Sequence, residues 1–277
     1  MRVHIVQSDI VWEDKAANHA HVREMLVGVG VAKGDLVVLP EMFDTGFSLN
    51  VERTHDGDGV SAAFVSELAK RLGAFVQAGV TAMGADGMGR NRCLVFSPGG
   101  EEIARYDKVH PFTFGREGER FAGGDRVTTY QWSEGEAAAG LRVCPAVCYD
   151  LRFPELFRAG LGLGAEMFAL GANWPAPRAA HWRALMIARA IENQAFTMGA
   201  NRCGEDPFLA YSGGSIVVSP EGEVLGEAGA EALVLSLDVD PEAVRSWREK
   251  FPAWRDGRAD LLPRLGDDGK IGGGQGI

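Results

Sequence analysis

The apolar positions of this chain follow two periods, one typical of strands and one typical of helices. Short apolar runs predict strands at 2–7, 35–39, 74–83, 127–132, 141–147, 165–170, 195–200 and 232–239. Apolar residues three or four positions apart predict helices at 14–31, 59–72, 155–161 and 178–194, and Asp240-Pro241 opens a last one. Because strands and helices alternate, we expect a layered α/β fold. No linker marks a boundary, so we expect a single domain over residues 1–277 with a glycine-rich tail at about 268–277.

Two stretches share the pattern V-x-S-P-x-G-E, at 95–101 and at 217–223. Each lies between strand-like residues and therefore predicts a β-hairpin, with the turn at Pro98 in one and at Pro220 in the other. The recurrence indicates two related sheets within one body rather than a tandem repeat.

Composition and charge narrow the class of protein. The chain is 46% hydrophobic and 24% charged, as ordinary globular proteins are. Its formal net charge of −10 argues against nucleic acid or an anionic membrane as the main partner. Residues 1–15 contain no apolar signal-peptide segment, and no window approaches 18 uncharged apolar residues. We therefore expect a cytoplasmic protein that does not span a membrane.

The cysteines and histidines form no metal-binding pattern. The four cysteines have neither C-x-x-C nor zinc spacing and are too sparse for a disulfide framework, which favours a reducing compartment. His19 and His21 lie two positions apart on a predicted helix and do not share a face, so we expect two solvated surface histidines. No metal is predicted.

One cysteine stands where a predicted strand breaks. The run 141–147 ends at Cys148 and a helix follows, so the side chain projects beyond the sheet, where helix N–H groups stabilise an anion. A free cysteine is more often a small buried hydrophobe, which is what we expect of Cys93, Cys144 and Cys203. Pro145 cannot donate to a sheet ladder, so it predicts a bulge or an unpaired position in this strand.

Two further polar residues, Glu41 and Lys108, also stand at the ends of predicted strands. In α/β sheets the active site collects at the carboxyl ends of the strands, so these residues and Cys148 can meet in space. A carboxylate base, a cation for a developing oxyanion and a thiol nucleophile are the groups that acyl transfer at a C–N bond requires.

Four ordered motifs carry a resemblance to a known family. They are LPEMF at 39–43, YDKVH at 106–110, CYDLRFPE at 148–155, and ANWP at 172–175 followed by HW at 181–182 and ARAIENQ at 188–194. Over roughly residues 1–255 the sequence resembles the nitrilase superfamily of carbon–nitrogen hydrolases. The residues of its motifs are most similar to those of the ω-amidase branch. The resemblance implies a four-layer α-β-β-α sandwich with two mixed β-sheets.

The resemblance also implies a role for each residue of the site. Cys148 would be the nucleophile that forms a thioester, and Glu41 the general base. Lys108, together with the backbone N–H of Tyr149, would bind the oxyanion. A second glutamate would position the lysine, and the pattern E-x-x-x-aromatic-x-x-G places it at Glu117, with Glu119 as a rival.

Further residues are candidates to bind the substrate, namely Phe43, Phe112, Tyr149, Arg152, Asn173 and Trp174. A carboxylate on the substrate requires a second cation, and Arg116, Arg152 and Arg178 stay open for that role. His110 and His181 keep open the alternative of a Cys–His hydrolase.

The activity implied is hydrolysis of the terminal amide of small 2-oxo acid monoamides, such as 2-oxoglutaramate and 2-oxosuccinamate, to the dicarboxylic acid and ammonia without a cofactor. Neighbouring branches act on deaminated glutathione or on N-carbamoyl amines. A non-catalytic scaffold with the same fold is an alternative of another class, and the joint presence of Glu41, Lys108 and Cys148 argues against it. Because family members commonly assemble, we expect a homodimer or a higher homo-oligomer.

Overall fold

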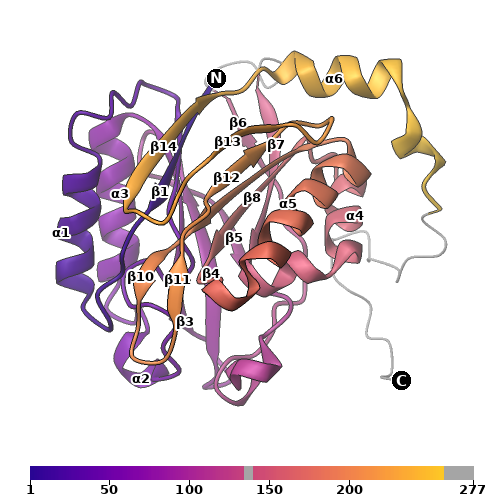
Figure 1. Ribbon diagram of the computed structural model, residues 1–277. Coiled ribbons are helices and arrows are strands. Elements are labelled where there is room, and N and C mark those ends of the chain that lie inside the picture. The colour runs from indigo at the N-terminus through magenta and orange to yellow at the C-terminus, as the bar shows by residue number, and fades with distance from the viewer. Residues whose placement is uncertain (134–139, 259–277) are drawn as a thin grey trace.

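Two mixed β-sheets stacked face to face form the centre of the molecule, and helices cover their outer faces (Figure 1). The computed structural model describes residues 1–133 and 140–258. The glycine-rich tail expected at 268–277 lies outside the described residues.

The strands are β1 (Arg2–Gln7), β2 (Leu36–Val38), β3 (Phe75–Met83), β4 (Gly89–Phe96), β5 (Glu102–Asp107), β6 (Tyr130–Trp132), β7 (Leu141–Val147), β8 (Met167–Ala172), β9 (Phe196–Asn201), β10 (Cys203–Glu205), β11 (Ala210–Ser212), β12 (Ile216–Val218), β13 (Val224–Glu227) and β14 (Leu233–Asp238). The α-helices are α1 (Lys15–Met25), α2 (Val51–Thr54), α3 (Val60–Leu72), α4 (Pro154–Gly162), α5 (Ala179–Asn193) and α6 (Pro241–Lys250). The 3-10 helices are η1 (Thr113–Gly115), η2 (Glu117–Glu119), η4 (Cys148–Arg152), η5 (Ala176–Arg178) and η6 (Ala253–Asp256).

Each large sheet has six strands and a parallel centre with antiparallel edges. The first has the order β14-β1-β2-β3-β4-β5, and the second has the order β13-β12-β9-β8-β7-β6. In the first, β1, β2 and β3 are parallel, and in the second β7, β8 and β9 are parallel. Figure 1 shows α1 and α3 against the first sheet and α4 and α5 on the far side of the second. The predicted four-layer α-β-β-α sandwich is therefore confirmed.

The continuous apolar runs of the parallel strands arise because both faces of each sheet are buried. In β2, Leu36 and Val38 join the large core that includes the second sheet, whereas Val37 and the following Leu39 join the core under α1 and α3. Successive side chains of a strand point to opposite faces, so one strand serves both cores.

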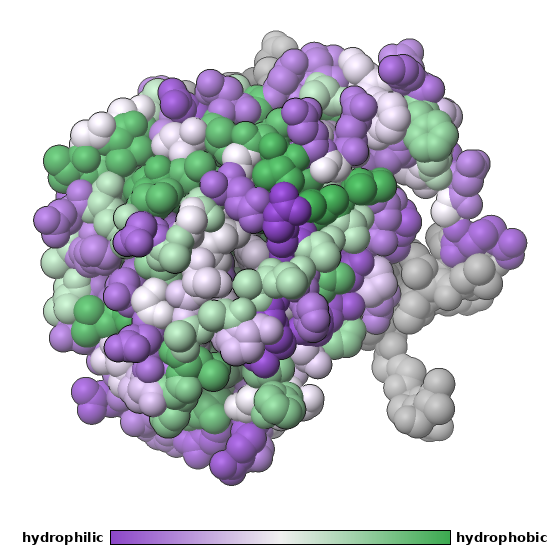
Figure 2. Space-filling model, in the orientation of Figure 1, coloured by the Kyte–Doolittle hydropathy of each residue, from purple (hydrophilic) through white to green (hydrophobic). Residues whose placement is uncertain are grey.

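The two V-x-S-P-x-G-E hairpins belong to different sheets. The first is β4–β5 at the edge of the first sheet, and the second is β12–β13 at the edge of the second. The prediction of two related sheets in one body is therefore confirmed. The edge strands β13 and β14 carry partly exposed leucines, and Figure 2 shows hydrophobic surface gathered in this part of the face.

The first helix differs from the prediction in its length and in its histidines. It ends at Met25 rather than near residue 31, because Gly28 and Gly30 that follow adopt positive φ values of 75° and 73°. The expectation of two solvated histidines is wrong for His19. The residue is 7% exposed, and its ring stacks on Phe64 and hydrogen-bonds Asp44 at 3.1 Å.

Pro145 sits in a regular part of β7. It pairs with Ala169 of β8 without a break in register, so of the two predicted alternatives the bulge is wrong and the unpaired position is right. The pairing of β6 with β7 covers only Leu141 to Val143, so Pro145 lies beyond the end of β6 and needs no donor on that side.

Two glycines bring the backbone of Glu41 between the sheets. A Cβ atom on Gly79 of β3 would lie 2.7 Å from the Glu41 Cα, and one on Gly171 of β8 would lie 2.8 Å from the Glu41 nitrogen. Because these neighbours are backbone atoms, they cannot rotate out of the way. The packing of the two sheets therefore requires glycine, which has no side chain, at both positions.

We predict that Gly171→Ala displaces Glu41 and lowers the free energy of unfolding by about 1–3 kcal/mol, the usual effect of overpacking. The turnover number should fall in the same variant. Gly162→Ala is the control, because a Cβ atom at the end of α4 meets nothing within 4 Å. Urea unfolding and amidase assays of both variants test this, and equal behaviour of the two would contradict it.

Candidate active site

A buried group of charges lies at the ends of β2 and β5. Lys108 Nζ donates to Glu41 Oε1 at 2.9 Å and to Glu117 Oε2 at 2.8 Å, and all three side chains are at most 1% exposed. Asn91 Nδ2 donates to both carboxylates, at 2.6 Å to Glu41 and 2.8 Å to Glu117. An ammonium has three N–H donors, so one of those on Lys108 is left for a group in the adjoining cavity.

Cys148 opens η4 directly after β7, as the sequence pattern predicted for the strand break. Its φ of 45° is unusual for a residue with a Cβ atom, as is the φ of 44° at Met42, the residue after Glu41. Such strained residues cluster at active sites, where the surrounding structure imposes them. Both turns are thus built to present a side chain in a fixed direction.

Asp150 ties the turn of Cys148 to the segment of Lys108. Its buried carboxylate accepts hydrogen bonds from the Tyr106 hydroxyl at 2.7 Å and from the Val147 backbone at 3.0 Å. It also accepts the His110 backbone N–H at 3.0 Å and contacts His110 Nδ1 at 2.9 Å. The carboxylate of Asp150 therefore holds the turn of Cys148 at a fixed distance from the segment that carries Lys108.

The protonation states follow from burial and from these charges. Burial alone would raise the pKa of Glu41, but the charge and hydrogen bond of Lys108 outweigh it and lower that pKa. Burial would lower the pKa of Lys108, but Glu117 and Glu41 raise it. Burial and the charge of Glu41 raise the pKa of the Cys148 thiol well above its usual value. The resting site therefore holds a carboxylate, an ammonium and a neutral thiol.

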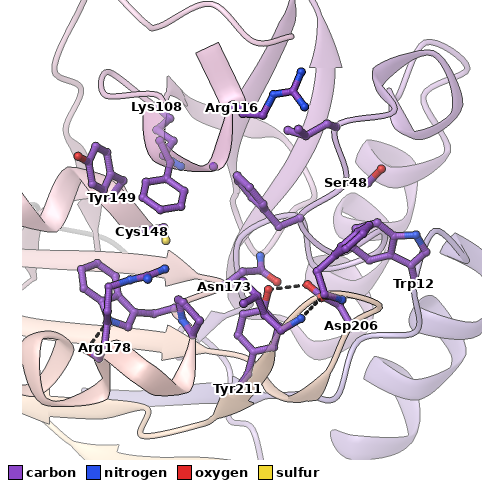
Figure 3. Close-up of a pocket in the computed structure, with 18 of the residues that line it drawn as sticks. Trp12, Ser48, Lys108, Arg116, Cys148, Tyr149, Asn173, Arg178, Asp206 and Tyr211 are labelled. Atoms are coloured by element: carbon purple, nitrogen blue, oxygen red, sulfur yellow. Dashed lines mark hydrogen bonds between the residues drawn. The ribbon is translucent and has the colours of Figure 1, made fainter. Parts of the chain in front are cut away.

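A cavity of about 640 Å³ opens beside these residues and is lined by Lys108, Cys148 and many aromatic side chains. Figure 3 shows Cys148 and Tyr149 at one end of the cavity and Trp12 at the other. The described residues contain no group of three or more histidine, cysteine or acidic side chains placed to bind a metal ion. No helix within the described part of the chain is long and apolar enough to cross a membrane.

Comparisons with known proteins show the family of this chain. Residues 2–249 match the carbon-nitrogen hydrolase family. The chain belongs to this family. It is 36% identical over 258 residues to the omega-amidase YafV of Escherichia coli, covering 92% of this chain and 96% of that protein. It is 34% identical to the 2-oxoglutaramate amidase of Bacillus subtilis, covering 82% of this chain and 86% of that protein.

A solved structure supports the same assignment. A carbon–nitrogen hydrolase superfamily protein from Xanthomonas campestris, which carries an arsenic adduct in its active site, is 34% identical with a TM-score of 0.87. The match covers 95% of this chain and 98% of that one. The sequence-based prediction of a carbon–nitrogen hydrolase is therefore confirmed.

The geometry distinguishes the two rival glutamates of this hydrolase. Glu117 is fully buried and accepts from Lys108, Asn91 and the backbone N–H of Phe112. Glu119 is exposed and pairs with Arg116 at 2.7 Å. Glu117 is thus the glutamate in contact with the lysine.

The two histidines of the alternative Cys–His site lie elsewhere. His110 contacts Asp150 and stacks on Phe153 at 3.8 Å, and His181 contacts Arg152 at 3.3 Å. Neither ring lines the cavity. The acidic group that acts on Cys148 is Glu41, whose charge and hydrogen bond raise the pKa of the thiol, so the geometry does not favour a histidine as the base for Cys148.

Most of the expected substrate-binding residues line the cavity, namely Phe112, Tyr149, Arg152, Asn173 and Trp174, together with the open candidates Arg116 and Arg178. Phe43 does not. It is 1% exposed and packs in the core under α1 and α3, because the chain turns after Glu41 and points the next side chains away from the cavity. Phe47, a few residues further on, lines the cavity.

Sequence reasoning missed other parts of the site, namely Trp12, Asn91, Asp206, Phe208 and Tyr211. Asn91 is a buried polar residue within β4, and its position inside a strand was the available signal. Tyr211 lies on the β10–β11 ribbon and donates a hydrogen bond to Asp206 at 2.6 Å. The sequence pattern did not predict this ribbon, because each of its strands has only three residues.

The pH dependence of the reaction tests the assignment of the base. As a base for Cys148, Glu41 would have to be ionised, and its pKa lies below the ordinary 4.5. We predict that kcat/KM stays level through neutral pH and falls only below about pH 4.5, as this carboxylate becomes protonated. An acid limb centred near pH 6.5 would instead indicate a histidine base.

Substitution of the two glutamates gives a matched comparison. Glu117→Gln removes a buried negative charge from Lys108, so we predict a loss of roughly 100-fold or more in kcat, the scale of a lost transition-state contact. Glu119→Gln changes an exposed ion pair and should leave kcat near the wild-type value. Equal kcat values for the two variants would exclude the role of Glu117.

Proposed function

We propose that this protein is an ω-amidase, which hydrolyses the terminal amide of 2-oxo acid monoamides such as 2-oxoglutaramate and 2-oxosuccinamate. The observation that carries the proposal is the contact of Lys108 with both Glu41 and Glu117 beside the thiol of Cys148. The names of the relatives from Escherichia coli and Bacillus subtilis point to the same substrate class.

The first half of the reaction forms a thioester. Because the Cys148 thiol is neutral at rest, Glu41 takes its proton as sulfur attacks the amide carbon. The third N–H of Lys108 and the backbone N–H of Tyr149 stabilise the oxyanion. Glu41 then gives the proton to the amide nitrogen, the C–N bond breaks, and ammonia leaves.

The second half regenerates the thiol. Glu41 takes a proton from a water molecule, whose oxygen attacks the thioester carbon. The same two donors stabilise the second oxyanion, the C–S bond breaks, and the sulfur recovers its proton from Glu41. The sum of both halves is one amide and one water converted to one acid and one ammonia, with no cofactor.

Two arginines are placed to bind the carboxylate of the substrate. Arg116 is already paired with Glu119 through two hydrogen bonds, of 2.9 and 2.7 Å. Arg152 lies over the Trp174 ring at 4.8 Å and Arg178 over the Phe112 ring at 5.5 Å, and among the described residues neither forms an ion pair with an acidic side chain. A stacked arginine whose guanidinium has no carboxylate partner suits a carboxylate ligand.

We further propose that the protein works in the cytoplasm as a homodimer or higher homo-oligomer. The partly exposed leucines of β13 and β14 support self-association, because apolar surface of this kind is commonly buried between subunits.

A panel of amides tests the substrate class. We predict that wild-type protein releases ammonia from 2-oxoglutaramate with a higher kcat/KM than from deaminated glutathione or N-carbamoyl-β-alanine. Cys148→Ala should abolish turnover of all three. A higher kcat/KM for one of the other two substrates would indicate the activity of a neighbouring branch of the family. Turnover by Cys148→Ala would exclude the thioester mechanism.

The arginines can be tested with substrates of different charge. We predict that Arg178→Ala and Arg152→Ala raise KM for 2-oxoglutaramate by about 10-fold or more, the value of a charge-assisted hydrogen bond. Turnover of a neutral amide such as butyramide should change little. Arg116→Ala is the control, and an equal effect of all three variants on both substrates would contradict the assignment.

A further inference from the structure

Asn173 is a cavity-lining residue with one unsatisfied polar atom. The residue follows β8 and is 6% exposed. Its Oδ1 is buried and has no hydrogen-bond partner, whereas its Nδ2 and its backbone N–H are both used. A buried acceptor without a donor is costly, so its partner is to be sought in what fills the cavity.

The orientation of this amide is fixed by its neighbours. Nδ2 lies 2.6 Å from the Glu41 carbonyl oxygen and 3.3 Å from Glu41 Oε2, and both of these atoms accept hydrogen bonds. A carbonyl oxygen or carboxylate oxygen cannot donate to Oδ1, so the nitrogen must face Glu41 and the oxygen must face away. The chemistry of the contact thus decides which end of the amide is free.

Asn173 and Cys148 line the same cavity, and both contact Glu41. The backbone N–H of Asn173 donates to Glu41 Oε2 at 2.9 Å, and Lys108 donates to the other oxygen of the same carboxylate. Lys108, the proposed oxyanion donor, and Asn173 thus contact different oxygens of Glu41. In Figure 3, Asn173 lies between Cys148 and the hydrogen-bonded pair of Asp206 and Tyr211.

We propose that Asn173 Oδ1 accepts a hydrogen bond from the N–H₂ group of the substrate amide and thereby selects primary amides over esters. This inference rests on the proposed amidase function. An amide nitrogen donates to Oδ1, and the bond persists as the nitrogen takes the proton from Glu41 and departs as ammonia. The bridging oxygen of an ester has only lone pairs, so it leaves Oδ1 unpaired and faces it as a second acceptor.

Asn91 supplies a matched control for the second role of Asn173, which is to hold Glu41. Asn91 Nδ2 also donates to the Glu41 carboxylate, at 2.6 Å, but Asn91 does not line the cavity. Loss of either asparagine weakens the support of the base, which both amide and ester cleavage need. Only loss of Asn173 removes an acceptor for the leaving nitrogen.

The experiment compares two substrates that differ at the leaving group, 2-oxoglutaramate and the γ-methyl ester of 2-oxoglutarate. The measured quantity is the ratio of kcat/KM for the amide to kcat/KM for the ester. Because both values come from one preparation, the ratio does not depend on the fraction of protein that is folded. We expect Asn173→Ala and Asn173→Ser to lower this ratio by about 10-fold or more, the value of one buried hydrogen bond.

Asn91→Ala should slow both substrates and leave the ratio unchanged. An equal loss on both substrates in the Asn173 variants, or the same change of ratio in Asn91→Ala, would overturn the inference. A wild-type enzyme that releases no ammonia from 2-oxoglutaramate would instead overturn the proposed function. In that case the same comparison is made with the amide that the wild type does hydrolyse and the methyl ester of the corresponding acid.

Discussion

The ion pair of Lys108 with two buried carboxylates is the interaction on which the site depends. Moving each such ion out of water costs several kcal/mol. The three buried charges are stable only because each has an oppositely charged partner and further hydrogen bonds. Glu41 receives hydrogen bonds from Lys108, Asn91 and Asn173, and Glu117 receives them from Lys108, Asn91 and Phe112. The charges keep Glu41 ionised where burial alone would neutralise it. In the proposed mechanism, this carboxylate takes the proton of the neutral Cys148 thiol.

The fold makes this ion group possible by bringing together segments from both sheets. Glu41 and Lys108 follow strands of the first sheet, whereas Cys148 and Asn173 follow strands of the second. Gly79 and Gly171 let the backbone of Glu41 pass between the sheets, and Asp150 ties the turn of Cys148 to His110, two residues after Lys108. The reacting groups are thus fixed by sheet packing and by one carboxylate, which is how an enzyme avoids reorganisation during reaction.

Sequence patterns predicted a layered α/β fold, the hairpins and the positions of Glu41, Lys108 and Cys148, because these depend on local periodicity and on strand ends. The four-layer arrangement was implied by the family resemblance. They failed where tertiary packing decides. His19 looks solvated from its neighbours in sequence, yet its ring packs against both Phe43 and Phe64. Phe43 stands beside Glu41 in the chain but on the opposite face. The ribbon β10–β11 was missed because its strands of three residues are too short for a period to appear.

The central claim is that Cys148 carries the acyl group between two steps that Glu41 serves. Intact-mass analysis of the enzyme, quenched in acid during turnover of 2-oxoglutaramate, tests it most directly. The account predicts an added mass equal to the substrate minus ammonia, located on the peptide of Cys148 and absent from Cys148→Ala. Turnover without any such adduct, together with activity in Cys148→Ala, would contradict it.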